Sequence, residues 1–338
     1  MLTAKEEKIL RSIKVRSDNN PKNPEFPPNK PRFPATPTYK IEVPGFSNVW
    51  LKDESDNPTG THKDRMAWEM VVTYRDFLVA KKLGHLRRLP HMSLITSGTA
   101  GYTIQKWLRG YKLPHLKCLV DSHLDSSVKR KLTSIGCEIY ETDLSKKPFT
   151  WEQILKLTDN PGGIDITSSE ALDPTTRYYD WLGYEIINTS PDVCFIPFGT
   201  GNLYENVLNV AKKEISSVRH DPRFRGNVHT LRNCCYIGAT TNNPQSKADK
   251  LYSPHLPFVH YGEQWIQFYR YAAYCGLHSD VHILKEQYLD EAIALGNELG
   301  LTFEPSGIAG LGMLLQLKNI VRKDAKILIV NTGKTKYD

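Results

Sequence analysis

The sequence predicts an α/β fold in which two lobes of parallel-rich sheets are covered by helices. Strand-like and helix-like segments alternate along most of the 338 residues, a pattern typical of parallel strands joined through helices. The strand-like segments are short apolar runs bounded by glycine, proline and small polar residues. We expect residues 1–52 to form an arm and part of the large lobe. Residues 53–170 then form the smaller lobe, and residues 171–338 the rest of the large lobe.

The region before residue 38 is predicted to lack a regular strand. Pro21–Pro37 contains seven prolines, which exclude a regular helix or a central strand because proline fixes φ and lacks a backbone N–H. We expect this segment to run extended, as an arm. Ahead of it, the pattern of Lys5–Ile13 predicts a short helix.

After the arm, apolar runs and helical periodicity alternate. Runs such as LKCLV, VCFIPF and KILIV are mostly apolar, which favours buried strands, and the longer segments between them favour helices. In chain order we expect strand 48–52, helix 64–83, strand 93–96, helix 102–108, strand 116–120, helix 126–135, strand 137–140, helix 176–188, strand 193–198, a helix from Leu203, strands 234–238 and 281–284, helices 287–299 and 308–317, and strand 326–330.

The bulk composition fits a globular protein. Its residues are 40% hydrophobic and 24% charged, and the formal net charge is +7. No apolar run approaches the ~20 residues of a membrane span, and we expect a cytoplasmic protein that binds neither membrane nor nucleic acid. The basic clusters at 81–88 and 129–131 are interpreted as solvated helix faces. We expect Cys118, Cys137, Cys194 and Cys234 to be buried free thiols without a metal.

The first candidate site follows the strand 48–52. Asn57-Pro58-Thr59-Gly60 has the composition of a turn, and Lys63 then falls in the first turn of a helix. The positive end of the helix dipole disfavours an ammonium there, so the position suits an amine that attacks an aldehyde. A solvated lysine after the helix start explains the charge pattern equally well.

The string N-P-T-G-T-H-K-D-R around Lys63 resembles the N-P-T-G-S-x-K-D-R segment of fold-type II pyridoxal-phosphate enzymes, above all threonine synthases. Cysteine synthases, serine and threonine dehydratases and the tryptophan synthase β-chain belong to the same superfamily, and His62 is similar to the residue before the lysine in the last of these. The resemblance implies pyridoxal 5'-phosphate as cofactor, carried as a Schiff base on Lys63 in a cleft between the two lobes. It also implies a homodimer.

Two glycine-containing loops resemble other parts of the family site. Small residues let backbone N–H groups approach an anion, and the helix that follows adds its dipole. The loop after strand 93–96 resembles the one that binds the substrate α-carboxylate, with Thr99 in place of an asparagine that bonds the cofactor's phenolic oxygen. The loop after strand 193–198 resembles the phosphate cup, although a plain tight turn is the alternative. The residues are Ser97, Gly98, Thr99, Ala100 and Gly101 in the first loop and Gly199, Thr200, Gly201, Asn202 and Leu203 in the second.

Two hydroxyls near the end of the sequence are candidates for the pyridine nitrogen. Thr332 follows the last strand, and Ser306 precedes the helix 308–317. The resemblance favours Thr332, and Ser306 alternatively caps its helix. A neutral hydroxyl at that nitrogen favours elimination and replacement over transamination.

The resemblance implies an enzyme acting on a small amino-acid substrate. The first expectation is a threonine-synthase-like replacement at Cγ of a phosphorylated homoserine, which makes the protein a carbon–oxygen lyase acting on phosphate. The second is β-elimination or β-replacement on a serine-type substrate, as in dehydratases, ammonia-lyases and cysteine synthases. The third is a binding protein that retains the fold without turnover, an alternative motivated by Thr99.

Overall fold

The computed structural model describes residues 33–145, 149–167, 177–252 and 277–337. The predicted helix Lys5–Ile13, the predicted arm up to residue 32 and the first residue of the predicted helix 176–188 lie outside these ranges. The chain divides into two compact units. Unit 1 contains Lys63–Tyr178 with Phe33, Pro34 and Tyr337, and unit 2 contains Ala35–His62 and Tyr179–Lys336.

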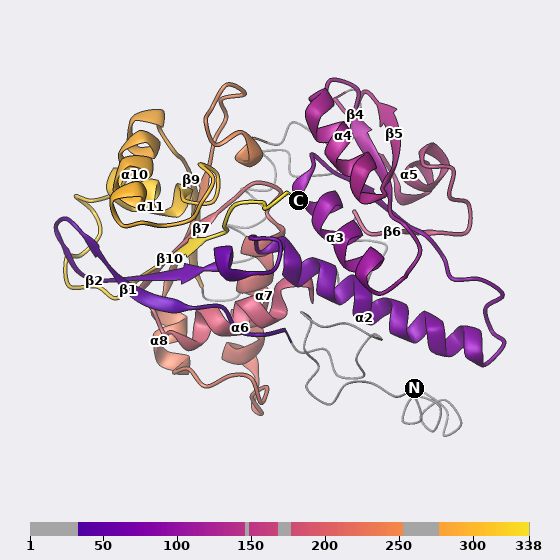
Figure 1. Cartoon of the computed structure of the whole chain (residues 1–338). Coiled ribbons are helices and arrows are strands. Elements are labelled where there is room, and N and C mark those ends of the chain that lie inside the picture. Colours follow the sequence, from indigo (N-terminus) through magenta and orange to yellow (C-terminus); the bar gives the residue numbers. More distant parts are fainter. Residues whose placement is uncertain (1–32, 146–148, 168–176, 253–276, 338) are drawn as a thin grey trace. The chain divides into compact units, whose positions relative to one another are not determined.

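Unit 2 is built on a six-stranded sheet whose strands, in sheet order, are β1 (Thr38–Val43), β2 (Phe46–Asp53), β10 (Ile327–Asn331), β7 (Val193–Pro197), β8 (Cys235–Thr240) and β9 (His278–Ile283). β1 and β2 form an antiparallel hairpin, and the other neighbouring pairs are parallel. The yellow β10, from the end of the sequence, lies between the indigo β2 and the salmon β7 (Figure 1). Sheet order thus joins strands that are far apart in sequence.

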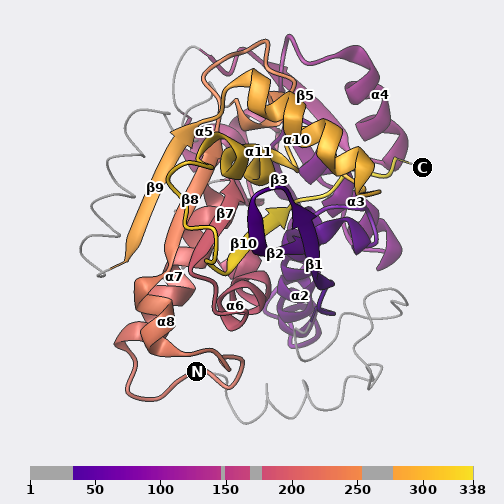
Figure 2. The same ribbon diagram turned by 90° about the vertical axis from the view of Figure 1, so that its left-hand side faces the viewer.

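Helices cover both faces of this sheet. On one face lie α10 (Glu286–Glu298) and α11 (Ala309–Gln316), and on the other lie α6 (Asp180–Asn188) and α7 (Asn202–Ser216), with α8 (Val228–Asn233) beside α7 (Figures 1 and 2). The segment AGLGMLLQ of α11 is apolar all round because the helix is buried on nearly every side. A Cβ on Gly310 of α11 would lie 3.1 Å from the carbonyl oxygen of Phe195 in β7, so the helix packs closely onto the sheet.

Unit 1 is built on a four-stranded parallel sheet whose strands, in sheet order, are β5 (Glu138–Thr142), β4 (Lys117–Asp121), β3 (Met92–Ile95) and β6 (Ile164–Asp165). Successive side chains of a strand point to opposite faces. Cys118 of β4 faces α3 (Thr99–Gly110) and α4 (Ser126–Ile135), since its Sγ lies 3.2 Å from where a Cβ on Gly101 would sit. Lys117 faces the other way, and its Nζ donates to the Thr158 carbonyl oxygen (3.1 Å) just after α5 (Trp151–Leu157).

The predicted α/β fold is confirmed, and most predicted elements are present within one to three residues of the expected bounds. The predicted helix 176–188 is different at its start, where a 3₁₀ turn, η2 (Arg177–Tyr179), precedes α6. Cys137 and Cys234 lie directly before β5 and β8 rather than inside them. Four further elements were not predicted from the sequence: β1, β6, α5 and α8.

The predicted burial of four thiols is confirmed. Cys118, Cys137, Cys194 and Cys234 are buried and free, while Cys235 is partly exposed. Burial raises the pKa of the Cys194 thiol, which makes it unreactive at neutral pH. In the described parts of the chain, no three His, Cys, Asp or Glu side chains are grouped so as to hold a metal ion. No described helix is both long and apolar enough to cross a bilayer.

Candidate active site

Three neighbouring strands of unit 2 end at the same edge of its sheet. β10 lies between β2 and β7 and is parallel to both, with Asn331 opposite Asp53. Because neighbouring strands lie about 4.8 Å apart, the segments that follow them begin close together. These segments are the turn before Lys63, the chain from Thr332, and the glycine loop 199–203. Three regions that the sequence pointed to separately therefore start side by side.

The turn before the predicted lysine is fixed by the segment that follows β10. Gly60 has φ +83°, a left-handed conformation that favours glycine, and its N–H donates to the carbonyl oxygen of Asn57 (2.8 Å). Thr61 forms an antiparallel bridge with Gly333. The N–H of Lys334 donates to the Gly60 carbonyl oxygen (2.8 Å). A Cβ on Gly60 would lie 2.2 Å from the Lys334 carbonyl oxygen, so a larger residue would displace this contact.

Thr332 contacts the residue that precedes Lys63. The backbone N–H of His62 donates to the Thr332 carbonyl oxygen (3.2 Å), and the N–H of Thr332 donates to the Gly307 carbonyl oxygen (3.1 Å). Thr332 is buried, with 8% of its surface exposed. These bonds hold His62, the last residue of the turn before Lys63, at the end of β10 within unit 2.

Ser306 is joined to the glycine loop through Lys250. The Ser306 hydroxyl accepts a hydrogen bond from the backbone N–H of Lys250 (3.2 Å), and the Lys250 ammonium pairs with Glu304. A Cβ on Gly199 would lie 2.6 Å from the Lys250 carbonyl oxygen, so the first residue of the loop packs directly on this segment. Ser306 does not cap α11, whose N-cap is Ile308 without a side-chain bond.

The glycine loop has the local geometry of an anion site. Gly201, with φ +82°, is the N-cap of α7 and has no side-chain cap bond. The first backbone N–H groups of a helix and its dipole attract anions, and glycines at 199 and 201 keep side chains out of the approach. Burial raises the pKa of Glu205 in the first turn of α7, which favours its uncharged form beside an anion. These residues fit the phosphate ester of a pyridoxal cofactor.

The buried carboxylate of Glu54, to which the sequence analysis assigned no role, contacts the turn before Lys63. Glu54 is fully buried in the 3₁₀ turn η1 (Glu54–Asp56). It accepts hydrogen bonds from Thr36 Oγ1 (2.5 Å) and Asn57 Nδ2 (2.8 Å). Burial and the charge of Glu54 raise the pKa of Tyr179, whose ring lies 5.3 Å from that of His62. The signal in the sequence was an acidic residue between a strand and its turn, which is equally typical of a solvated loop.

Lys63 is the first residue of α2 (Lys63–Lys82), as predicted, and it is partly buried. Its position at the helix N-terminus disfavours the ammonium form. The next residue, Asp64, is buried and accepts a hydrogen bond from Trp107 Nε1 of α3 (2.6 Å). Trp107 in turn packs edge-on against Trp68 of α2. The first turn of α2 is therefore held against α3 within unit 1.

The predicted carboxylate loop follows β3 and leads into α3. The Thr96 hydroxyl accepts hydrogen bonds from the N–H groups of Gly98 (3.1 Å) and Gly101 (3.2 Å), which closes the loop on itself. Gly98 has φ +134° and is the N-cap of α3. A Cβ on Gly101 would lie 2.9 Å from Thr96 Cγ2. Thr99 is the first residue of α3 and is largely buried.

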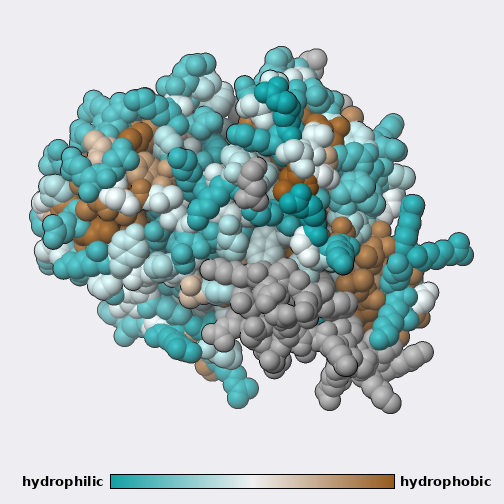
Figure 3. All heavy atoms as spheres, in the orientation of Figure 1, coloured by the Kyte–Doolittle hydropathy of each residue, from teal (hydrophilic) through white to brown (hydrophobic). Residues whose placement is uncertain are grey.

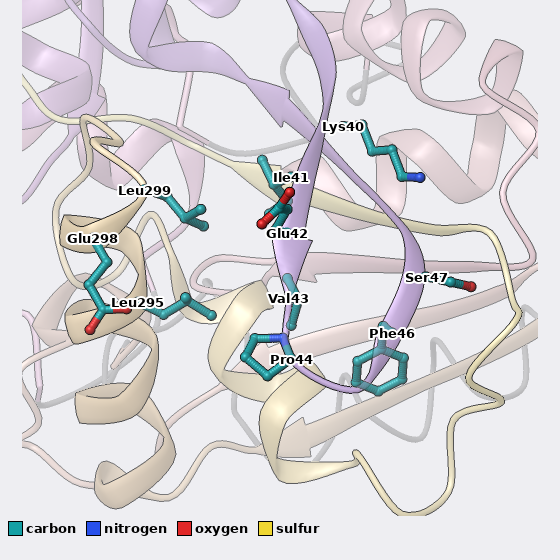
Figure 4. Close-up of a pocket in the computed structure, with 10 residues that line it drawn as sticks. All are labelled: Lys40, Ile41, Glu42, Val43, Pro44, Phe46, Ser47, Leu295, Glu298 and Leu299. Atoms are coloured by element: carbon teal, nitrogen blue, oxygen red, sulfur yellow. The ribbon is translucent and has the colours of Figure 1, made fainter.

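A cavity of about 760 Å³ in unit 2 lies elsewhere, at the start of β2 and the end of α10. Pro44 and Phe46 face it from the β1–β2 hairpin, with Leu295 on α10 and Leu299 directly after that helix (Figure 4). Hydrophobic side chains gather on the surface over this hairpin and α10 (Figure 3). None of the residues that line the cavity is a predicted site residue, and it opens at the amino end of β2, whereas the lysine turn follows its carboxyl end.

The chain resembles pyridoxal-phosphate enzymes of known structure. It superposes on an O-ureido-L-serine synthase with a TM-score of 0.62 at 16% identity, covering 89% of both chains. For an O-acetylserine-dependent cystathionine β-synthase from Helicobacter pylori the TM-score is 0.61 at 15% identity, covering 89% of this chain and 92% of that one. For threonine deaminase isoform 2 from Solanum lycopersicum it is 0.56 at 16% identity, covering 86% and 80%. At these identities the likeness establishes the fold.

Sequence comparison identifies the family. Cysteine synthase B of Escherichia coli (strain K12) is 30% identical over 109 residues, which are 31% of this chain and about a third (33%) of that protein. Residues 32–333 match the family described as pyridoxal-phosphate dependent enzyme. The chain therefore belongs to the pyridoxal-phosphate-dependent enzymes of fold type II, and its cofactor is pyridoxal 5'-phosphate.

Proposed function

We propose that the chain catalyses elimination or replacement at the side chain of an amino acid, with Lys63 as the residue that binds the cofactor covalently. The sheet order β2-β10-β7 carries this proposal. It brings the turn before Lys63, Thr332 and the glycine loop to neighbouring strand ends. These three regions offer an amine, a neutral hydroxyl and an anion site, which are the groups that a pyridoxal aldehyde, ring nitrogen and phosphate require.

The glycine loop, Thr332 and Lys63 are each assigned to one part of the cofactor or the substrate. The N–H groups of the loop 199–203 bind the phosphate, and the Thr332 hydroxyl hydrogen-bonds the ring nitrogen. Ser306 is the second candidate for that nitrogen, since its hydroxyl accepts the Lys250 N–H and keeps its own proton to donate. When bound, the cofactor supplies a conjugated ring that stabilises negative charge at the substrate Cα. Lys63, kept neutral at the helix N-terminus, takes the proton from that Cα.

The loop 97–101 is assigned to the substrate. Its position between a strand end and the start of α3 is typical of sites for a carboxylate in α/β sheets. We assign the substrate α-carboxylate to this loop, and the Thr99 hydroxyl to the cofactor's phenolic oxygen. A hydroxyl is shorter than the asparagine amide of the family, so Thr99 is the position where this chain departs most clearly from the family pattern.

The leaving group defines two candidate reactions. The Lys63 string favours a threonine-synthase-like replacement at Cγ of a phosphorylated homoserine, with cleavage of a carbon–oxygen bond to phosphate. The match to cysteine synthase B favours β-elimination or β-replacement on serine or an O-substituted serine instead. A third outcome, a protein that binds the cofactor without turnover, is consistent with Thr99 in place of asparagine.

The covalent assignment is tested by absorbance and reduction. Wild-type protein supplied with pyridoxal phosphate should show an absorbance band in the violet, and borohydride should abolish the band and fix the cofactor on a peptide containing Lys63. Lys63→Ala should show neither, whereas Lys82→Ala, at the other end of α2, should match the wild type. Absence of the band in the wild type, or its persistence in Lys63→Ala, contradicts the proposal.

A panel of amino acids then separates the reactions. A spectral change and phosphate release with O-phosphohomoserine support the first reaction. Pyruvate or a β-substituted product from serine or O-acetylserine supports the second. Bound cofactor that responds to no amino acid in the panel identifies a protein without turnover.

A further inference from the structure

Tyr337 lies against the loop that we assign to the substrate carboxylate. Within unit 1, its ring packs edge-on against Tyr102 of α3, with the ring centroids 4.8 Å apart. The Lys131 ammonium of α4 lies 4.2 Å from the centroid of the Tyr337 ring. These two contacts fix the ring from two sides, since an edge-to-face pair and a cation over a ring both restrict its orientation.

The Tyr337 hydroxyl lies near the N-terminus of α3. Its oxygen lies 3.8 Å from where a Cβ on Gly98 would sit, and Gly98 is the N-cap of α3. Among the residues that the structure describes, Tyr337 has no hydrogen-bonded partner for this oxygen. A phenol hydroxyl can donate a hydrogen bond to a carboxylate.

We infer that Tyr337 is a substrate-binding residue whose hydroxyl donates a hydrogen bond to the amino-acid carboxylate held by the loop 97–101. The helix end and the phenol then face the same anion from two directions. The inference rests on the proposed function, because it takes the loop as the carboxylate site. It adds a residue from the segment after β10 to the substrate site, together with Lys131, which positions its ring.

The test uses the cofactor-loaded protein and measures binding rather than turnover. Dissociation constants of L-serine and of serinol, its analogue without a carboxylate, are obtained from the change in cofactor absorbance. Tyr337→Phe keeps the ring that packs on Tyr102 but removes the hydroxyl. It should weaken L-serine binding roughly tenfold, the size expected for one hydrogen bond to a charged group, and leave serinol binding unchanged. Tyr111→Phe, just after the other end of α3, is the matched control and should change neither constant.

Each outcome has one meaning. A selective loss of L-serine affinity in Tyr337→Phe supports the inference. Equal affinities in Tyr337→Phe and wild type, or an equal loss for L-serine and serinol, overturn it and leave the proposed function intact. Failure of the wild type to bind L-serine or any other amino acid of the panel overturns the carboxylate assignment of the loop, and the role of Tyr337 with it.

Discussion

Replacing Glu54 with glutamine should destabilise unit 2 and loosen the turn before Lys63. The Glu54 side chain is fully buried, and its two oxygens accept hydrogen bonds from Thr36 Oγ1 (2.5 Å) and Asn57 Nδ2 (2.8 Å). Glutamine has nearly the same shape, but its amide nitrogen donates instead of accepting. The Thr36 hydroxyl can reverse its role and accept, so both contacts survive as hydrogen bonds between neutral groups.

The expected cost follows from this change of charge. A hydrogen bond to a charged group contributes about 1.5–3 kcal/mol, and one between neutral groups about 0.5–1.5 kcal/mol. Two bonds that change in this way lose about 2–3 kcal/mol, and the lower desolvation cost of an amide offsets part of that loss. We expect a decrease of about 2 kcal/mol in the free energy of unfolding for Glu54→Gln. Glu54→Ala removes the carboxylate that accepts from Thr36 Oγ1 and Asn57 Nδ2 and should cost about 3–5 kcal/mol.

Urea unfolding measures the loss, and hydrogen exchange of the peptide covering residues 54–62 shows whether it is local to the turn. The matched control is Asp290→Asn, also a carboxylate-to-amide change in unit 2. Asp290 is half-exposed and pairs with Lys247 on the surface (2.6 Å), so its loss should cost less than about 1 kcal/mol. If Glu54→Gln and Asp290→Asn have the same effect on stability, or if exchange of residues 54–62 does not increase, the buried carboxylate does not hold the turn.

Two further predictions concern the glycine loop and the pH dependence of stability. Gly201→Ala and Gly300→Ala both introduce a Cβ where φ is positive (+82° and +68°), and each should lower the free energy of unfolding by about 1–2 kcal/mol. Only Gly201→Ala should also weaken binding of pyridoxal phosphate, by about tenfold. Equilibrium titration of cofactor absorbance measures this affinity. Equal affinity in the two variants would contradict the assignment of the loop. Hydrogen bonds from Arg223 hold the pKa of Asp221 below its usual range, so this carboxylate stabilises the fold above pH ~4, the unfolded pKa. The difference in unfolding free energy between wild type and Asp221→Asn should therefore be constant at neutral pH and should shrink as the pH falls below about 4.

The elements predicted correctly are those whose local pattern is strong. The apolar runs of β4, β7 and β10 are buried on both faces, as continuous apolar strands should be. β1 was not predicted, although TYKIEV alternates polar and apolar residues as a half-exposed edge strand does. β6 has only two residues, Ile164–Asp165, too few to show any period. α5 did carry a start signal, the capping box of Thr150 with Gln153.

The individual residues of the candidate site could be predicted from the sequence, but their positions relative to one another could not. Each loop follows a strand, and that was visible in the sequence. The neighbour relations were not, because the order β2-β10-β7 joins segments that end at residues 53, 331 and 197. Sheet order depends on long-range pairing, which local periodicity does not encode. The contacts of Glu54 and Tyr337 are of the same kind, since each depends on a partner that is distant in sequence or on a different element.

The reaction class depends on which group faces the ring nitrogen of the cofactor. The side chains at the carboxyl end of β10 are the candidates for that group. A carboxylate at that nitrogen would favour its protonated form and hence transamination, whereas a hydroxyl favours elimination and replacement. Asp53, opposite Asn331, is one acid at this strand end. Its Oδ1 accepts from the Ser55 N–H and from Asn331 Nδ2, and its Oδ2 accepts from the Tyr39 hydroxyl, all at 3.0 Å. With both oxygens held by the fold itself, Asp53 is committed to structure. The Thr332 hydroxyl, one residue beyond Asn331, is therefore the better candidate for the ring nitrogen, which supports elimination or replacement over transamination.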